Sequence, residues 1–149
     1  MKKIKILVVS ILLLSLNNVF AAEHQIKMLN GSSDDMFKFE PAVLKIKKGD
    51  TVKWIATDPT HNTASIKEML PKGAKSWNGK MNEEVSVKFD VEGLYGYSCT
   101  PHVMFGMVGL IIVDDPSSNL ETSKAYALKQ EGKWVANKGR FSKYFNQIK

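Results

Sequence analysis

The residues best suited to chemistry lie in one nine-residue stretch, CTPHVMFGM, at positions 99–107. It holds Cys99, the one cysteine of the chain, with His102 three positions later and Met107 five positions after that. A second histidine with a suitable setting, His61, lies in the segment TDPTHNTAS. A thiolate, two imidazoles and a thioether are all metal ligands, so these side chains together predict a metal site.

The combination of donor types indicates copper. Two histidines and a cysteine in a trigonal arrangement, with a weak axial methionine, form a blue-copper electron-transfer site. The soft thiolate stabilises Cu(I), imidazole suits both oxidation states, and a weak thioether adds little bonding, so little has to move when an electron arrives. We therefore expect His61, Cys99, His102 and Met107 to hold one copper ion that alternates between Cu(I) and Cu(II).

Three other interpretations stay open at this point. Zinc can be bound by one cysteine and two histidines, although it has no use for the methionine, and the nearest acidic residue, Glu68, is expected in an exposed turn. A hydrolase with Cys99 as nucleophile would need a third residue that orients the base, and none stands out. A copper storage or delivery module without redox cycling would expose several methionines or histidines together, whereas the remaining methionines here are scattered.

The spacing also predicts how the backbone positions these residues. Cys99 would end one strand, the loop over 100–106 would carry His102, and Met107 would begin the next strand, so a single loop supplies three ligands. His61 must then come from another loop at the same end of the domain. Its neighbour Asn62 is expected to tie the two loops together, with its backbone N–H donating to the Cys99 sulfur.

Residues 24–113 have the pattern of a β domain. The segments HQIKMLN, VLKIK, TVKWIA, VSVKFD and YGYSC are short and partly alternating, and GLIIV is a continuous apolar run typical of a strand buried on both faces. Turn-forming residues separate them, which favours a sandwich or a barrel.

Two helices are expected after the last strand. Asn119 is a candidate N-cap for a helix over 120–130. A second helix over 139–147 would carry one apolar stripe that docks on the sandwich, formed by Phe141, Tyr144, Phe145 and Ile148.

The first 21 residues predict a secretory signal peptide. Three lysines at positions 2, 3 and 5 precede an apolar run over 6–16, and Val19 and Ala21 suit a cleavage site. Removal of residues 1–21 would leave a β-sandwich over 22–115 and a helical extension of the same domain over 116–149. We expect the mature protein in a bacterial periplasm, free of the membrane, where a lone thiol without a disulfide partner is protected by a metal.

The basic charge is unevenly distributed. The formal net charge is +6, but three lysines belong to the predicted signal, and residues 120–149 carry seven basic side chains against two acidic ones. No basic stripe with interleaved aromatic residues is present, so a nucleic-acid partner is not expected.

The chain resembles the pseudoazurins, type 1 copper proteins of the cupredoxin family. The similarity rests on the segments HQIKMLN, FEPAVLKIKKGDTVKW, HNTASIKEMLPKGAKSW and YGYSCTPHVMFGMVGLIIV. The Cys-x2-His-x4-Met spacing is shared with plastocyanin, and the C-terminal helical extension favours pseudoazurin. The resemblance implies an all-β, Greek-key cupredoxin sandwich of about eight strands with two C-terminal helices packed on it. It also assigns the copper ligands as His61, Cys99, His102 and Met107.

The same resemblance implies a function and a class of partners. It indicates a periplasmic one-electron carrier that is not an enzyme and that serves copper nitrite reductase, a c-type cytochrome or a peroxidase. Partners would dock around His102, the ligand expected to reach the solvent, on an apolar patch formed by Met36, Pro59, Pro101, Val103, Met104 and Phe105. Lysines often surround this histidine in the family, but the corresponding positions here are Gly31, Pro59, Asn78 and Ser98, so we expect apolar docking by a monomer.

Overall fold

The computed structural model describes residues 21–148. The predicted signal peptide therefore lies almost wholly outside the described residues. Within the described range, none of the helices has the length and apolar character needed to cross a membrane.

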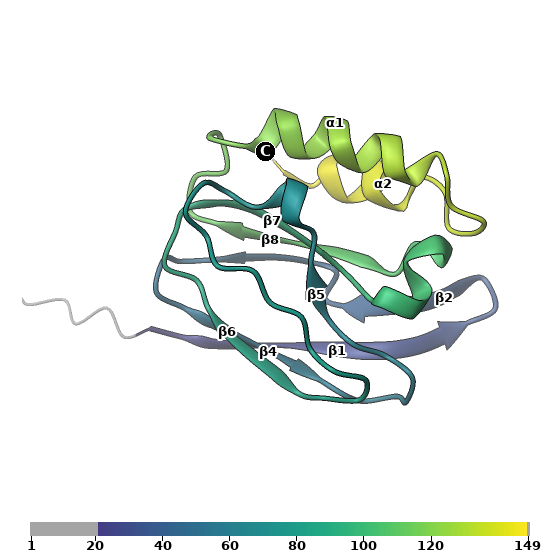
Figure 1. The fold of residues 1–149 in the computed structure, drawn as a ribbon. Coiled ribbons are helices and arrows are strands. Elements are labelled where there is room, and N and C mark those ends of the chain that lie inside the picture. The colour runs from purple at the N-terminus through teal and green to yellow at the C-terminus, as the bar shows by residue number, and fades with distance from the viewer. Residues whose placement is uncertain (1–20, 149) are drawn as a thin grey trace, which may run out of the picture.

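Eight strands form two four-stranded sheets that pack face to face (Figure 1). The first sheet has the order β2-β1-β4-β6, with bounds Asp35–Glu40, Glu23–Ser32, Thr51–Ile55 and Val85–Lys88. The second has the order β3-β8-β7-β5, with bounds Val43–Ile46, Val108–Val113, Gly93–Ser98 and Ala64–Ser65. Strand β1 runs parallel to β4 and β3 runs parallel to β8, while the other pairs are antiparallel. The predicted eight-stranded sandwich is confirmed.

Strand β8 is buried on both faces, as its apolar sequence predicts. All six of its residues are buried. Ile111 and Val113 belong to the core between the sheets, whereas Val108, Leu110 and Ile112 belong to a second core beneath the helices. Because successive side chains of a strand point to opposite faces, only a continuous apolar run can serve two cores at once.

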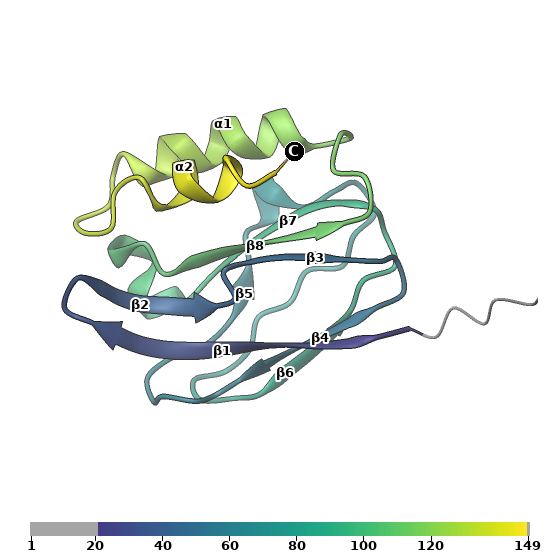
Figure 2. The same cartoon turned by 180° about the vertical axis from the view of Figure 1, so that it is seen from behind.

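The helices α1 (Leu120–Glu131) and α2 (Arg140–Phe145) lie over the sheet that contains β7 and β8 (Figure 2). The predicted stripe on α2 is confirmed, because Phe141, Tyr144 and Phe145 are buried in the second core and Ile148 packs against it.

Asn119 occupies the N-cap position of α1 as predicted, but the prediction that its side chain caps the helix was wrong. Asn119 precedes the helix, but its side chain makes no capping hydrogen bond. Its Oδ1 accepts from the backbone N–H of Leu94 at 2.9 Å, and its Nδ2 donates to the Leu94 carbonyl at 2.8 Å. Asn119 therefore fastens the start of α1 to strand β7, a long-range contact that the local sequence does not reveal.

Three segments that are distant in sequence meet at one end of the sandwich. These are the β1–β2 turn, the short 3₁₀ helix η2 (Thr100–Phe105) and the loop between α1 and α2, which lie at the same end in both ribbon views (Figures 1 and 2). The described chain begins at the opposite end. The predicted ligands lie at the end where the three segments meet.

Candidate metal centre

The segment between β7 and β8 positions Cys99, His102 and Met107 as their spacing predicts. Cys99 follows β7 directly, His102 lies within η2, and Met107 immediately precedes β8. The backbone N–H of Cys99 donates to the Met107 carbonyl at 2.9 Å, which extends the β7–β8 ladder by one pair. Because paired residues of antiparallel strands share a face, the Cys99 and Met107 side chains lie on the same side, and both are fully buried in the core between the sheets.

His61 reaches the same place from the loop between β4 and β5. Its carbonyl accepts from the backbone N–H of Asn82 at 2.8 Å, and Asn82 in turn accepts from the Thr60 N–H at 2.7 Å. The adjacent Asn62 joins this loop to η2, because its side chain accepts from the Thr100 N–H at 2.7 Å and donates to the Thr100 hydroxyl at 3.1 Å. The prediction that Asn62 ties the two loops together is confirmed.

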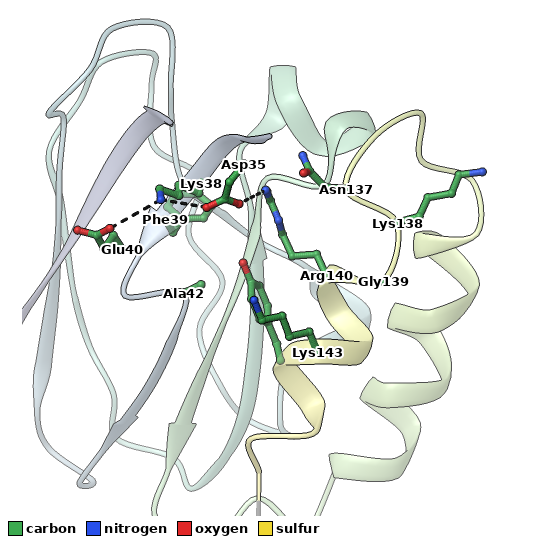
Figure 3. A pocket seen from close by; sticks show the side chains of 11 residues that line it. Asp35, Lys38, Phe39, Glu40, Ala42, Asn137, Lys138, Gly139, Arg140 and Lys143 are labelled. Carbon is green, nitrogen blue, oxygen red and sulfur yellow. Dashed lines mark hydrogen bonds and ion pairs between the residues drawn. The ribbon is translucent and has the colours of Figure 1, made fainter. Parts of the chain in front are cut away.

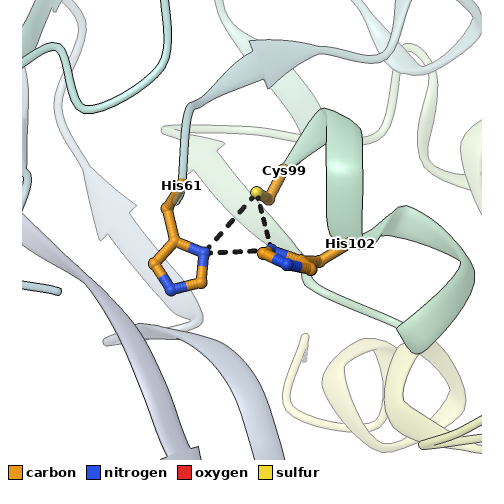
Figure 4. A group of neighbouring side chains, drawn as sticks. All are labelled: His61, Cys99 and His102. Carbon is orange, nitrogen blue, oxygen red and sulfur yellow. Dashed lines mark hydrogen bonds between the residues drawn. The ribbon is translucent and has the colours of Figure 1, made fainter. Parts of the chain in front are cut away.

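Three ligand atoms converge in the geometry of a metal site (Figure 4). The Cys99 Sγ lies 3.7 Å from Nδ1 of His61 and 3.5 Å from Nδ1 of His102, and the two nitrogens are 3.1 Å apart. A triangle with these sides has a circumscribed radius of about 2.0 Å, close to the metal–nitrogen and metal–sulfur distances of about 2.0–2.3 Å known for such ligands. The donor set and its spacing therefore fit one metal ion.

The orientation of the His61 ring is fixed from outside the triangle. Its Nε2 lies 2.9 Å from Oδ1 of Asn30, and an amide oxygen can only accept, so Nε2 carries the proton. The unprotonated Nδ1 then faces Cys99 and His102, as a metal ligand requires. Sequence reasoning missed Asn30, because nothing in its local pattern indicates contact with a histidine 31 positions away.

Burial favours the neutral forms of all three groups. It lowers the pKa of His61, with a further contribution from the nearby charge of His102, and it lowers the pKa of His102 as well. Burial raises the pKa of the Cys99 thiol, while the backbone amides of Asn62 and His102 act in the opposite direction. The imidazoles are thus ready to bind a metal at neutral pH, whereas the thiol needs the metal to stabilise its thiolate.

The two histidines differ in their access to solvent. His61 is fully buried, and His102 is partly exposed, as the sequence predicts. Of the six residues of the predicted apolar patch, Pro59, Pro101, Met104 and Phe105 are exposed, while Met36 and Val103 are half-buried. The α1–α2 loop adds Val135, a residue that sequence reasoning missed. Val135 is 68% exposed, and its backbone N–H donates to the Met104 carbonyl at 2.8 Å.

Phe37 is a further residue at the site that the sequence did not predict. Its ring stacks on His102 with the centroids 4.0 Å apart and the planes within 10° of parallel. The rings of Phe37 and Phe105 form a T-shaped pair with their centroids 5.4 Å apart. No spacing rule connects Phe37 with His102, since the contact arises from the packing of strand β2 against η2 in the folded chain.

Comparison with known proteins agrees with this geometry. The family described as "Copper binding proteins, plastocyanin/azurin family" matches residues 26–114. The pseudoazurin of Methylorubrum extorquens is 45% identical over 105 residues, which cover 70% of this chain and 71% of that protein. The pseudoazurin of Paracoccus pantotrophus is 40% identical over 114 residues, which cover 76% and 79% of the two chains.

A solved structure decides the family within this group. The crystal structure of pseudoazurin from Methylobacterium extorquens AM1 superposes with a TM-score of 0.74 at 39% identity, covering 85% of this chain and 99% of that one. The chain belongs to the pseudoazurin family. As in other pseudoazurins, the cofactor is copper, and at the level of the family the chain is a cupredoxin electron carrier and not an enzyme.

Proposed function

We propose that His61, Cys99, His102 and Met107 bind one copper ion, and that this ion shuttles single electrons between redox proteins of the periplasm. The observation that carries the proposal is the convergence of two imidazole Nδ1 atoms and one thiol sulfur within 3.7 Å of one another. Bound copper would supply a centre that gains and loses one electron. The burial of Met107 on the same face as Cys99 supports its assignment as the fourth residue that would hold the metal.

The two histidines and the apolar residues around His102 would have different roles in this function. His61 is buried and held by Asn30, so it would anchor the metal from the protein side. His102 is the partly exposed ligand, and we assign electron transfer to its solvent-facing edge. The apolar residues around it would exclude water during a brief encounter with a partner.

The same proposal includes the location and the class of partner. An N-terminal segment with the pattern of a signal peptide supports export to the periplasm, with cleavage after Ala21. The apolar surface beside His102 supports docking of another redox protein there, and we name copper nitrite reductase, c-type cytochromes and peroxidases as the classes to test.

The decisive experiment compares copper-loaded wild-type protein with Cys99→Ser. The wild type should bind one copper per chain, absorb visible light intensely through charge transfer from thiolate to Cu(II), and lose the colour reversibly on reduction. Cys99→Ser should be colourless yet fold normally by circular dichroism.

Ser98→Ala serves as the matched control. Ser98 is the preceding residue of β7, its side chain lines a cavity on the helix side of the sheet, and its replacement should leave the colour intact. A blue Cys99→Ser protein would refute the ligand assignment. Stoichiometric copper without colour or reversible reduction in the wild type would instead indicate a storage or delivery module.

A further inference from the structure

Phe37 covers one face of His102 although its backbone adopts an unfavourable conformation. Its φ of 52° lies in the left-handed region, which is uncommon for a bulky residue. Such a conformation is energetically costly and persists only where surrounding contacts impose it. The parallel stacking on His102 therefore depends on contacts that hold this part of strand β2 in place.

The group that holds it is the guanidinium of Arg140, the first residue of α2 (Figure 3). Its Nη1 donates to the carbonyl of Phe37 at 2.7 Å and to that of Gly106 at 2.8 Å. Its Nη2 donates to the Asp35 carboxylate at 2.8 Å and to the Met36 carbonyl at 3.1 Å. One side chain, 6% exposed, thus joins strand β2 to the C-terminal end of the ligand loop.

A neighbouring residue supports the same two segments. Nδ2 of Asn137, in the α1–α2 loop, donates to the carbonyls of Met36 at 3.2 Å and Phe105 at 2.7 Å. The C-terminal region therefore bonds both the segment that carries Phe37 and the segment that carries His102, and it sets their separation.

The chemistry requires arginine at this position. The guanidinium presents five donors in a rigid planar fork, so it can serve three carbonyls and one carboxylate together, whereas a lysine ammonium is a compact charge with three donors. Loss of the fork would remove this donor from the carbonyl groups of Met36, Phe37 and Gly106. It would also release the strained backbone of β2 at Phe37.

We propose that Arg140 is a positioning residue for the metal centre. Its guanidinium holds the Phe37 ring flat against His102 by donating hydrogen bonds to the carbonyls of Met36, Phe37 and Gly106. The proposal deepens the copper-carrier function and, for its effect on copper, rests on that function. The stack restricts rotation of the His102 ring and shields one of its faces from water. The helical extension thereby controls the surroundings of the exposed ligand from outside the ligand loop.

The first test uses metal-free protein, so it does not depend on copper. The face of a phenylalanine ring shifts the proton resonances of a stacked imidazole upfield, and this shift at His102 is read by NMR. Phe37→Leu should abolish the shift, and Arg140→Met should lose most of it. Lys143→Met, an exposed position on the same helix, should keep it in full. Wild-type ring shifts in Arg140→Met would overturn the proposal.

Arg140→Lys keeps the charge and most of the stem, so it decides the question if Arg140→Met does not fold. It should also lose most of the upfield shift, because lysine cannot reach the three carbonyls together. A wild-type shift in Arg140→Lys would overturn the role assigned to the fork.

The second test measures the reduction potential of the copper-loaded variants. Arg140→Lys should shift the potential in the same sense as Phe37→Leu, and the double variant should show no further shift. Additive shifts, or an unchanged potential in Arg140→Lys, would overturn the link to the metal. Failure of the protein to bind redox-active copper would defeat the proposed function, while the NMR result would still decide whether Arg140 positions Phe37.

Discussion

Asn30 shows how a single exposed side chain controls the chemistry of a buried one. By accepting from Nε2 of His61, it leaves Nδ1 free to face the thiol of Cys99. The other tautomer would direct an N–H at the metal position and would prevent binding. Partners of this kind are as much a part of a metal site as the ligands themselves.

Replacement of Asn30 should weaken the site without unfolding the protein. In Asn30→Ala, the His61 ring loses its fixed tautomer and orientation, so copper affinity should fall by about 10–100-fold. Competition titration with a Cu(I) chelator measures this affinity. Asn146→Ala, at an exposed position after α2, is the control that should bind copper normally. Equal affinities for the two variants would mean that Asn30 does not orient His61.

At the scale of elements, one cross-strand pair governs how β7 and β8 fit together beside the ligands. Tyr97 lies opposite Gly109 in the ladder, and its fully buried ring packs over the glycine. A Cβ at position 109 would overlap the Tyr97 ring and hydroxyl. The Tyr97 ring also packs in T-shaped contacts with Phe39 and Trp54, which restrict its movement.

Gly109→Ala should therefore destabilise the whole sandwich. Overpacking in a tightly filled core typically costs about 1–3 kcal/mol, and urea unfolding of the metal-free protein measures the loss. Gly132→Ala is a matched control, because Gly132 has helical φ and ψ and no atom nearer than 3.7 Å to the added Cβ. That variant should be neutral or more stable by about 0.4–1 kcal/mol. Similar stability of the two variants would show that the Tyr97 ring can move to accommodate the added Cβ.

At the scale of the whole molecule, Asp50 closes the end of the sandwich opposite the metal centre. Its buried carboxylate accepts from the backbone N–H of Ala22 at 2.8 Å and of Lys47 at 3.1 Å, and it bonds Nε2 of His24 at 2.9 Å. These contacts join strand β1 to the turn that precedes β4. The hydrogen bond with His24, followed by that of Ala22, holds the pKa of the Asp50 carboxyl below its ordinary value of 3.8.

The sign of this pKa shift predicts an acid-sensitive contribution to stability. Because the folded state lowers the pKa, the contribution is fully present above about pH 5 and is lost as the pH falls through the lowered value. Asp50→Asn should be less stable by about 1–3 kcal/mol at neutral pH, and the difference from wild type should shrink below pH 4. Urea unfolding at several pH values measures both effects. Asp34→Asn, an exposed carboxyl, should follow the wild-type curve; a constant difference for Asp50→Asn across the pH range would contradict the argument.

The distribution of charge and apolar surface predicts how partners dock. Met104 and Phe105 are exposed beside His102, and positions 31, 59, 78 and 98 hold the uncharged residues Gly31, Pro59, Asn78 and Ser98. Electron transfer with a c-type cytochrome should therefore depend only weakly on ionic strength. A steep fall with added salt would show that the basic side chains of residues 120–149 steer the partner instead.

The rate of electron transfer to the same partner also tests the contribution of the apolar surface beside His102. Met104→Ser should slow stopped-flow electron transfer about fivefold, the equivalent of roughly 1 kcal/mol of lost apolar docking energy. Leu128→Ser removes an equally exposed apolar side chain from helix α1 and should leave the rate unchanged. Equal rates for all three proteins would place the docking surface elsewhere.

The sequence by itself determined the features that depend on neighbouring residues. The donor types of Cys99, His102 and Met107 indicate copper, and their spacing allows a single loop between two strands to bring all three together. Alternation, apolar runs and the stripe on α2 predict the strands and the helices, because burial follows the local period of each element. Strands β2 and β5 were not predicted, since β2 follows a polar turn and β5 has two residues.

Only the tertiary structure decided which distant residues complete the site. Asn30 on His61, Phe37 on His102 and Arg140 on the carbonyls of both segments join positions about 30 to more than 100 residues apart. The same is true of Asn119, which suits an N-cap locally but bonds strand β7 instead. Such contacts depend on the relative placement of packed elements, and that placement has no periodic signature in the chain, because it follows from the shape of the two cores as a whole.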